Sequence, residues 1–446
     1  MNPTRLPRTG ELPSYRLPPV FETTLANSLE VVVVEDRRLP LVTARLGFQA
    51  GSKFDPKGLA GLSESTAALL TEGTRTRTAR RLAEQVAAIG GTLKADSSPD
   101  ALIIGASTLA DGLPKTLELL ADVARNAVFP SREVALRKQN RRQALLAQRS
   151  QAEFLAAEKF VEVLFAPHPY CRQDPTLESI ERLSRAGMVA FQERHLAPND
   201  AVLILLGALP PPGQTLELVR TRFGDWKRRR VPLAPPARFP RPRPSITLVN
   251  RPGSVQADIR IGRLAVTRAH PDYFPVLTAN NILGGSTSSR LFMNIREKKG
   301  FAYDAHSAVV PLKDSGVASV ITQVRNEVLA PALEAVLAEM RRLGQRPVGG
   351  KELAATKNYL NGVFVIRLET PDGLASQLAG LRLMGLPLSY LERYGDRVRA
   401  VEPERLRAAA AKYFDPEVAT IVVVGDAEKL LPQLEKFGTV KVEEAR

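Results

Sequence analysis

Two stretches of this chain show the same order of apolar and polar positions. The first, "LEVVVVEDRRLPLVTARLGFQAGS" at 29–52, has two apolar runs that are separated by a break at Pro40 and end in a Gly-Ser turn. The second, "PSITLVNRPGSVQADIRIGRLA" at 244–265, has two such runs around a Pro-Gly break. Short apolar runs bounded by proline and glycine are typical of strands. Each stretch therefore predicts a pair of β-strands.

The segments after each strand pair also follow one order: a helix, a shorter helix, more strands, a long amphipathic helix, another helical stretch and a closing apolar strand. In the first half these lie at 58–71, 78–91, 92–108, 113–129, 131–160 and 201–209, and in the second at 271–285, 289–300, 301–324, 328–345, 349–367 and 419–427. This order predicts an α+β fold in which one unit is used twice in tandem, each an antiparallel-rich sheet packed with helices.

A proline-rich basic segment, "VPLAPPARFPRPRP" at 231–244, separates the two units. We assign 231–245 as a linker, 15–230 as the N-terminal domain and 246–440 as the C-terminal domain. Because similar units joined by such a linker are typical of separate domains, we expect two lobes that hinge around a shared interior.

Composition limits the classes of function. The 446 residues carry a formal net charge of +15, and 44% of them are hydrophobic, as in a globular protein with more than one domain. A single cysteine, Cys171, excludes an intrachain disulfide and a cysteine-rich zinc site. The basic residues are mostly scattered arginines without alternating aromatic residues, so we expect no nucleic-acid partner. Attraction to an acidic partner stays open.

The sequence predicts no membrane segment. The first residues, "MNPTRLPRTGELPSYRLPPVF", contain no continuous apolar run of the kind found in signal peptides and anchors. The apolar stretch at 201–212 is short and ends in prolines. We expect a cytoplasmic protein, or a periplasmic one if a leader has been removed.

One stretch carries a family resemblance. "ILGGSTSSRLF" at 282–292, followed by "IREKKGFAYDAHS" at 295–307, closely resembles the C-terminal-half signature of the M16 (pitrilysin/insulinase-type) zinc metallopeptidases, subfamily B. The doubled unit and weaker stretches at 87–107 and 357–379 extend the resemblance over nearly the whole chain. It implies two tandem M16/LuxS-like metallohydrolase-type halves, which together form one half of a clamshell.

In that family a helix carries an inverted His-x-x-Glu-His motif, and a later helix supplies a third zinc ligand, a glutamate. At the motif this chain reads "GLSES", with Gly61 and Ser65 four apart on the expected helix and only Glu64 retained. The third-ligand region, 141–144, reads "RRQA" and contains no acidic residue. Catalytic zinc needs three protein ligands, so we expect no metal in this chain. Glu64 is then a helix-surface carboxylate or a partner for an arginine.

The histidines do not replace the missing ligands. His168, His195, His270 and His306 are far apart in the sequence, and each is interpreted as structural.

Two residues of the resembling stretch match the family's substrate-binding pair, Arg296 and Tyr303. An arginine suits a carbonyl or carboxylate, and a tyrosine hydroxyl can donate to a developing oxyanion. The alternative is a helix-end charge and a half-buried strand aromatic. Gly284 and Gly285 fit a helix end, and they also match the region of a substrate-handling glycine-rich loop in related processing peptidases.

This combination, a lost zinc motif beside a retained Arg/Tyr pair, resembles the non-catalytic subunits of split M16B enzymes. The resemblance implies a heterodimer in which a homologous partner supplies zinc, the general base and the sheet edge for an extended peptide substrate. Residues 91–95 correspond to that edge in active members, and here we expect the strand to be vestigial.

Two other hypotheses stay open. One is a structural scaffold on the same fold without catalysis. The other is a peptide-binding or basic surface module, active as a monomer or homodimer.

Overall fold

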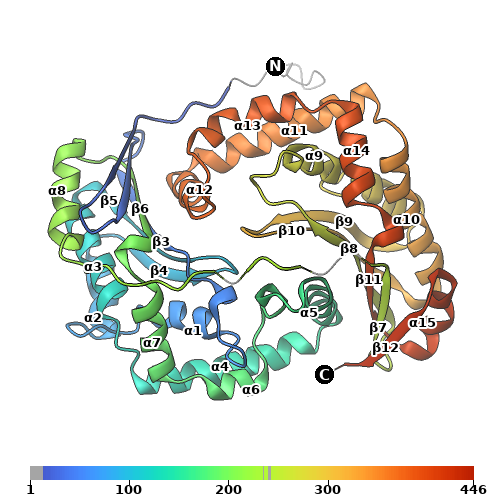
Figure 1. Ribbon diagram of the computed structural model, residues 1–446, viewed down its shortest axis with the longest axis horizontal. Helices are drawn as coiled ribbons and strands as arrows, with labels where there is room; N and C mark the ends of the chain where they lie inside the picture. Colours follow the sequence, from blue (N-terminus) through green and yellow to red (C-terminus); the bar gives the residue numbers. More distant parts are fainter. Residues whose placement is uncertain (1–13, 235, 240–242, 446) are drawn as a thin grey trace, which may run out of the picture.

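The computed structural model describes residues 14–234, 236–239 and 243–445. Within these ranges it contains two six-stranded mixed sheets, one from each half of the chain (Figure 1). The first sheet has the strand order β1-β2-β6-β3-β5-β4, and the second has the order β12-β7-β11-β8-β10-β9. Apart from the outermost strands β1 and β12, the two orders match position by position, so the predicted tandem α+β fold is confirmed.

The strands of the first sheet are β1 (Val20–Thr24), β2 (Glu30–Glu35), β3 (Leu41–Phe48), β4 (Thr92–Ser97), β5 (Leu102–Leu109) and β6 (Ala201–Gly207). Those of the second are β7 (Ser245–Asn250), β8 (Gln256–Ala265), β9 (Ala302–Pro311), β10 (Gly316–Arg325), β11 (Thr420–Gly425) and β12 (Val440–Glu444). β2 pairs parallel with β6, and β7 pairs parallel with β11. From β6 to the β4 edge and from β11 to the β9 edge, neighbouring strands pair antiparallel.

The helices of the N-terminal half are α1 (Leu62–Leu69), α2 (Ala79–Ala88), α3 (Leu113–Asn126), α4 (Ser131–Arg149), α5 (Ala152–Phe165), α6 (Leu177–Arg182), α7 (Arg185–His195) and α8 (Pro212–Phe223). Those of the C-terminal half are α9 (Tyr273–Leu283), α10 (Leu329–Gln345), α11 (Gly350–Glu369), α12 (Pro371–Leu383), α13 (Ser389–Arg399), α14 (Pro403–Tyr413) and α15 (Ala427–Leu434). A π-helix at Phe292–Lys298 takes the place of the second short helix predicted there.

The two halves differ at their outermost strands. β1 pairs antiparallel with β2, to which a short turn joins it, whereas β12 pairs parallel with β7. Helix α15 precedes β12 in the chain, and a parallel pair needs such a crossover. The sequence pattern missed both strands, because each is short and lies at a sheet edge.

Each half contributes one helix to the sheet of the other half (Figure 1). Helix α5 of the N-terminal half packs on β8 and β11, and α12 of the C-terminal half packs on β3 and β6. Helix α12 lies close to β3 at Gly47. A Cβ at this position would lie only 2.8 Å from Leu383 Cδ1 of α12. Side chains of β2 and β6 therefore share one buried apolar cluster with the C-terminal half.

Ion pairs fasten both exchanged helices. Arg45, a buried arginine on β3, pairs with Asp372 at the start of α12. On α5, Lys159 pairs with Glu443 of β12 at 2.8 Å. The halves are thus interlocked on both sheets, in addition to the linker that joins them in the chain, and the sequence analysis did not predict this exchange.

A buried lysine joins the halves at a third place. Lys53 is 2% exposed, and its Nζ lies 2.8 Å from Asp100 Oδ1 and 3.0 Å from Asp314 Oδ2. Asp314 belongs to the turn between β9 and β10 of the C-terminal half, and Tyr170 donates a hydrogen bond to both carboxylates. The cluster therefore holds the β9–β10 hairpin against the N-terminal half.

The described part of the linker, 231–234, 236–239 and 243–244, contains no helix or strand. Phe239 from this segment packs on His168, with ring centroids 4.6 Å apart, and on the ring of Tyr170. Phe239 of the linker thus packs beside Tyr170, a member of the Lys53 cluster.

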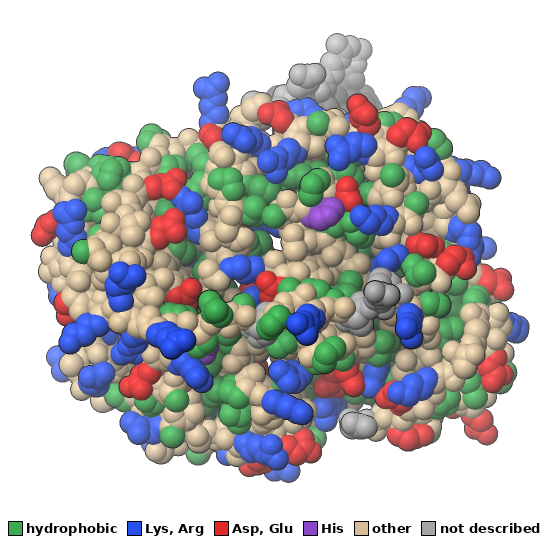
Figure 2. Space-filling model, in the orientation of Figure 1, with side chains coloured by type: hydrophobic (Ala, Val, Ile, Leu, Met, Phe, Trp, Pro, Cys, Tyr) green, Lys and Arg blue, Asp and Glu red, His purple; other side chains and the backbone are tan. Residues whose placement is uncertain are grey.

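Charged side chains of both signs cover the face shown in Figure 2, where Lys and Arg alternate with Asp and Glu. None of the helices within the described ranges has the length and apolar character that crossing a membrane requires.

We predict that Lys53→Ala lowers the free energy of unfolding by about 3–5 kcal/mol, because it leaves two partly buried carboxylates without their buried cation. Urea denaturation measures the change. Lys57→Ala, an exposed lysine four positions along the chain, is the matched control and should shift stability by no more than about 0.5 kcal/mol. Equal unfolding midpoints for the two variants would contradict the structural role of the cluster.

Candidate functional site

The degenerate zinc motif lies at the start of α1. Gly61 is the N-cap residue, with φ of 90°, a left-handed conformation that favours glycine. The helix therefore begins at Leu62, four residues later than the predicted start at 58. Asp55 holds this helix end, because its buried carboxylate accepts hydrogen bonds from the backbone N–H groups of Gly61 at 2.8 Å and Ser63 at 2.9 Å. Burial raises the pKa of Asp55 to about 6.

Ser65, at the second lost histidine position, points into the protein. Its side chain is 1% exposed, and its hydroxyl has no hydrogen-bond partner among the described residues. Gly61 has no side chain, and a Cβ there would lie 3.0 Å from Cβ of Pro175. Neither position presents a metal ligand.

Glu64 forms ion pairs with two arginines of α4. Arg137 Nη2 lies 2.7 Å from Glu64 Oε1, and Arg141 Nε lies 3.3 Å from Glu64 Oε2. Arg141 also faces Asp174, at 3.9 Å, and burial raises the pKa of that carboxyl while the charge of Arg141 lowers it. Glu64 was expected to be a helix-surface carboxylate or a partner for an arginine. In the structure it pairs with two arginines.

The rest of the third-ligand region does not approach this group. Arg142, Gln143 and Ala144 are exposed on α4, and only Arg141 faces Glu64. Farther along α4, Arg149 pairs with Glu158 of α5 at 3.1 Å. The sequence did not single out Arg137 or Asp174; Arg137 stands one helical turn before Arg141, and this spacing was an available signal.

These residues do not fit zinc. The position that zinc ligands would surround in the family holds two guanidinium groups, which repel a divalent cation, and the retained carboxylate is bound to both of them. Within the described ranges no three His, Cys, Asp or Glu side chains are arranged to hold a metal ion. We therefore assign no chemical step in this chain to a metal.

The structure brings Arg296 and Tyr303 together. Arg296 lies on the π-helix, and its guanidinium carbon is 4.9 Å from the ring centroid of Tyr303 on β9 and 4.6 Å from that of Phe292. Tyr303 is 85% exposed, an unusual exposure for a tyrosine on a strand. The half-buried strand aromatic considered from the sequence is thus wrong for Tyr303. Contacts with these two rings restrict the orientation of Arg296. Its Nε also lies 3.4 Å from Oε1 of the exposed Glu297, so its two Nη groups are the ones left for a ligand.

Gly284 and Gly285 lie between α9 and the π-helix, where the backbone packs closely on β9. A Cβ at Gly284 would lie 2.2 Å from the backbone N of Ser307, and one at Gly285 would lie 2.7 Å from Cα of Asn281. Backbone packing requires both glycines, and Gly285 also lines a cavity.

The histidines lie in separate surroundings. Both His168 and His195 are buried against aromatic rings, and burial lowers the pKa of each, to about 4 for His195. His270 Nδ1 accepts from the backbone of Asp272, and His306 Nδ1 lies 2.6 Å from Asp304 Oδ2.

The strand that corresponds to the peptide-binding edge is β4, and it is an edge of the first sheet, as β9 is of the second. Its side chains alternate between exposed and partly buried positions.

Comparison with known proteins gives the family. The insulinase (peptidase family M16) model matches residues 30–169, and the peptidase M16 inactive domain model matches residues 182–360, together well over half of the chain. An uncharacterized zinc protease of Mycobacterium bovis is 28% identical over 421 residues, which cover 92% of this chain and 94% of that protein. Subunit beta of the mitochondrial-processing peptidase of Mus musculus is 24% identical over 450 residues, 96% of this chain and 89% of the relative.

A solved structure agrees with this assignment. The crystal structure of a peptidase M16 inactive domain from Pseudomonas fluorescens superposes with a TM-score of 0.85 and 26% identity, covering 91% of this chain and 98% of the other. The chain belongs to the M16 peptidase family.

We predict that the double variant Gly61→His, Ser65→His does not retain zinc through dialysis. The left-handed backbone at Gly61 disfavours histidine, and Arg137 and Arg141 keep Glu64 bound and repel the cation. Inductively coupled plasma mass spectrometry measures zinc per chain, with the wild-type protein as the control. One zinc held per chain by the variant would show that the site lacks only its histidines.

Proposed function

We propose that this chain is the non-catalytic subunit of a heterodimeric M16B zinc metallopeptidase. The observation that carries the proposal is a contrast between the two halves. In the N-terminal half, two arginines bind the retained carboxylate Glu64, whereas in the C-terminal half Arg296 and Tyr303 lie together with Tyr303 exposed. One half has lost its reactive centre and the other displays groups that suit a peptide.

The Arg/Tyr pair acts on a peptide that a zinc-bearing homologue holds. Arg296 binds a carbonyl oxygen of the peptide by charge-assisted hydrogen bonds, and its contacts with the rings of Phe292 and Tyr303 restrict its direction. The hydroxyl of Tyr303 donates to the oxyanion that develops when water attacks the scissile carbonyl. The partner supplies zinc, the general base that activates this water and the sheet edge on which the peptide adds as a strand.

Two features of the relatives support a divided enzyme. The mouse relative is named as a subunit, and the bacterial relative is named as a zinc protease. A chain of this family whose own motif holds arginines in place of a metal needs a second chain for zinc chemistry. In this proposal β4 takes no substrate, since Arg137 and Arg141 bind the carboxylate of the neighbouring motif.

We predict that Tyr303→Phe lowers kcat of the purified heterodimer by about 10²–10³-fold, because it removes one oxyanion donor. The complex is isolated through an affinity tag on this chain, and hydrolysis of a fluorogenic peptide is followed. Arg296→Ala should raise KM and lower kcat together. Lys298→Ala, an exposed change on the same π-helix, is the control and should leave both constants unaltered.

Size-exclusion chromatography must show each variant still bound to the zinc-bearing subunit. An unchanged kcat/KM for both Arg296→Ala and Tyr303→Phe in an intact complex would refute the proposal and favour a structural scaffold. Peptide or nucleic-acid binding by a monomer or homodimer, without any zinc-bearing partner, would favour a binding module.

A further inference from the structure

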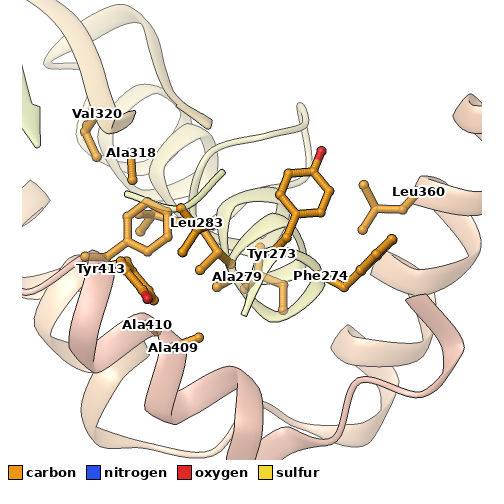
Figure 3. Packing of buried hydrophobic residues seen from close by; sticks show 14 of the residues in the cluster. Tyr273, Phe274, Ala279, Leu283, Ala318, Val320, Leu360, Ala409, Ala410 and Tyr413 are labelled. Atoms are coloured by element: carbon orange, nitrogen blue, oxygen red, sulfur yellow. The ribbon is translucent and has the colours of Figure 1, made fainter. Parts of the chain in front are cut away.

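A cavity of about 430 Å³ lies in the C-terminal half between α9, α11 and β9. Helix α9 packs on both of the other elements. Figure 3 shows α9 within its buried cluster, with Tyr273 directed toward Leu360 of α11, on the opposite side of the helix from Ala410 and Tyr413. Tyr273 and Leu360 both line the cavity.

The cavity has a counterpart in the other half. In the matched strand orders, β9 takes the place of β4, and α9 follows its strand pair as α1 does. Helix α1 contacts both α4 and β4, just as α9 contacts both α11 and β9. The cavity therefore occupies the position in the C-terminal half that the degenerate zinc motif occupies in the N-terminal half. Here, however, the position is an open space.

The cavity is positively charged. Arg268 and Arg367 line it, and none of the described residues around it is a carboxylate. Arg268 stacks on Tyr390, with its guanidinium carbon 4.8 Å from the ring centroid, and donates only long hydrogen bonds, 3.3 and 3.4 Å, to the neutral side chain of Gln377. Both guanidinium groups also act on Tyr273, whose pKa is raised by burial and lowered by the two positive charges. An anion would meet two cations whose charge no lining residue neutralises.

The cavity also contains a hydrogen-bond acceptor that needs a donor, the side-chain oxygen of Asn280. Asn280 is 8% exposed and lines the cavity, and its Oδ1 has no hydrogen-bond partner among the described residues. A buried acceptor without a donor costs free energy, so a ligand with an N–H group would satisfy it. The wall beyond is apolar and aromatic, formed by Val363, Phe364 and Tyr394.

We propose that this cavity binds the C-terminal residue of an extended peptide. The α-carboxylate lies between Arg268 and Arg367, the backbone N–H of the last residue donates to Asn280 Oδ1, and the last side chain packs on the aromatic wall. A bare anion such as phosphate satisfies the arginines and leaves Asn280 without a donor. A peptide end satisfies both.

The place of the cavity on β9 connects it to the Arg/Tyr pair, and this connection rests on the proposed function. Ser307 lines the cavity and lies four residues along β9 from Tyr303, roughly 13 Å at 3.3 Å per residue. A short peptide segment along this strand would reach from the cavity to Arg296 and Tyr303. The cavity would then hold substrates or products at their carboxyl end.

The test uses this chain alone, with neither a partner nor zinc. Fluorescein-labelled alanine hexapeptides that end in leucine, phenylalanine or lysine are prepared as free acids and as C-terminal amides, and fluorescence anisotropy measures their binding. At least one free acid should bind about tenfold or more tightly than its amide, as expected for charge-assisted hydrogen bonds.

Variants separate the cavity from general attraction to a basic protein. Arg268→Gln should abolish the difference between acid and amide, and Asn280→Asp should weaken binding of the acid by placing a second carboxylate beside it. Arg405→Gln, an exposed arginine on α14 that does not line the cavity, is the control and should keep the full difference. Circular dichroism confirms that each variant is folded.

Equal binding of acid and amide, or an acid preference that survives in folded Arg268→Gln, would overturn the proposal. Inorganic phosphate that displaces the free acid as well as unlabelled free-acid peptide does would reduce the cavity to a simple anion site and also overturn it. Because the measurement needs no partner, its failure leaves the heterodimer proposal standing, and its success does not depend on that proposal.

Discussion

The exchange of helices between the two halves is the constraint on which the rest of this structure depends. Helix α5 packs on the second sheet and α12 packs on the first, so each sheet needs a helix of the other half to complete its apolar packing. The buried Lys53 cluster then fixes the β9–β10 hairpin against the N-terminal half. As a result, the strand that carries Tyr303 has a fixed position relative to the N-terminal half of the chain. A rigid display of this kind suits a group that must meet a peptide held by another chain.

Arginines neutralise carboxylates that lie around α1. In this chain Arg137 and Arg141 bring positive charge to Glu64 and Asp174, and so help to hold α1 and α4 together. The arginines are side chains of the fold, always present and always charged. In the proposed function the arginines thus stabilise the N-terminal half in place of a metal, and the C-terminal half, with its Arg/Tyr pair and its cavity, offers groups to a ligand.

The sequence predicted the repeated α+β unit because the apolar runs and their proline and glycine breaks are local signals. It also led to the proximity of Arg296 and Tyr303, through a family resemblance, since an arginine and a tyrosine seven residues apart carry no such information by themselves. The helix exchange was not predictable, because the apolar and polar positions of α5 and α12 do not indicate which of the two sheets each helix covers. The pairing of Lys53 with Asp314, and the cavity beside Arg268, likewise join residues far apart in the chain. The start of α1 was placed too early because the turn at Gly61 depends on Asp55, a contact that periodicity does not reveal.

In the proposed function this chain completes an active site that a second chain of the same family begins. Native mass spectrometry of the complex isolated from the organism tests this division of the site. We predict a mass equal to one copy of this chain, one copy of a homologue with an intact His-x-x-Glu-His motif, and one zinc ion that leaves with the homologue on dissociation. A mass that corresponds to this chain alone, to two copies of it, or to a complex without a zinc-bearing homologue would contradict the account.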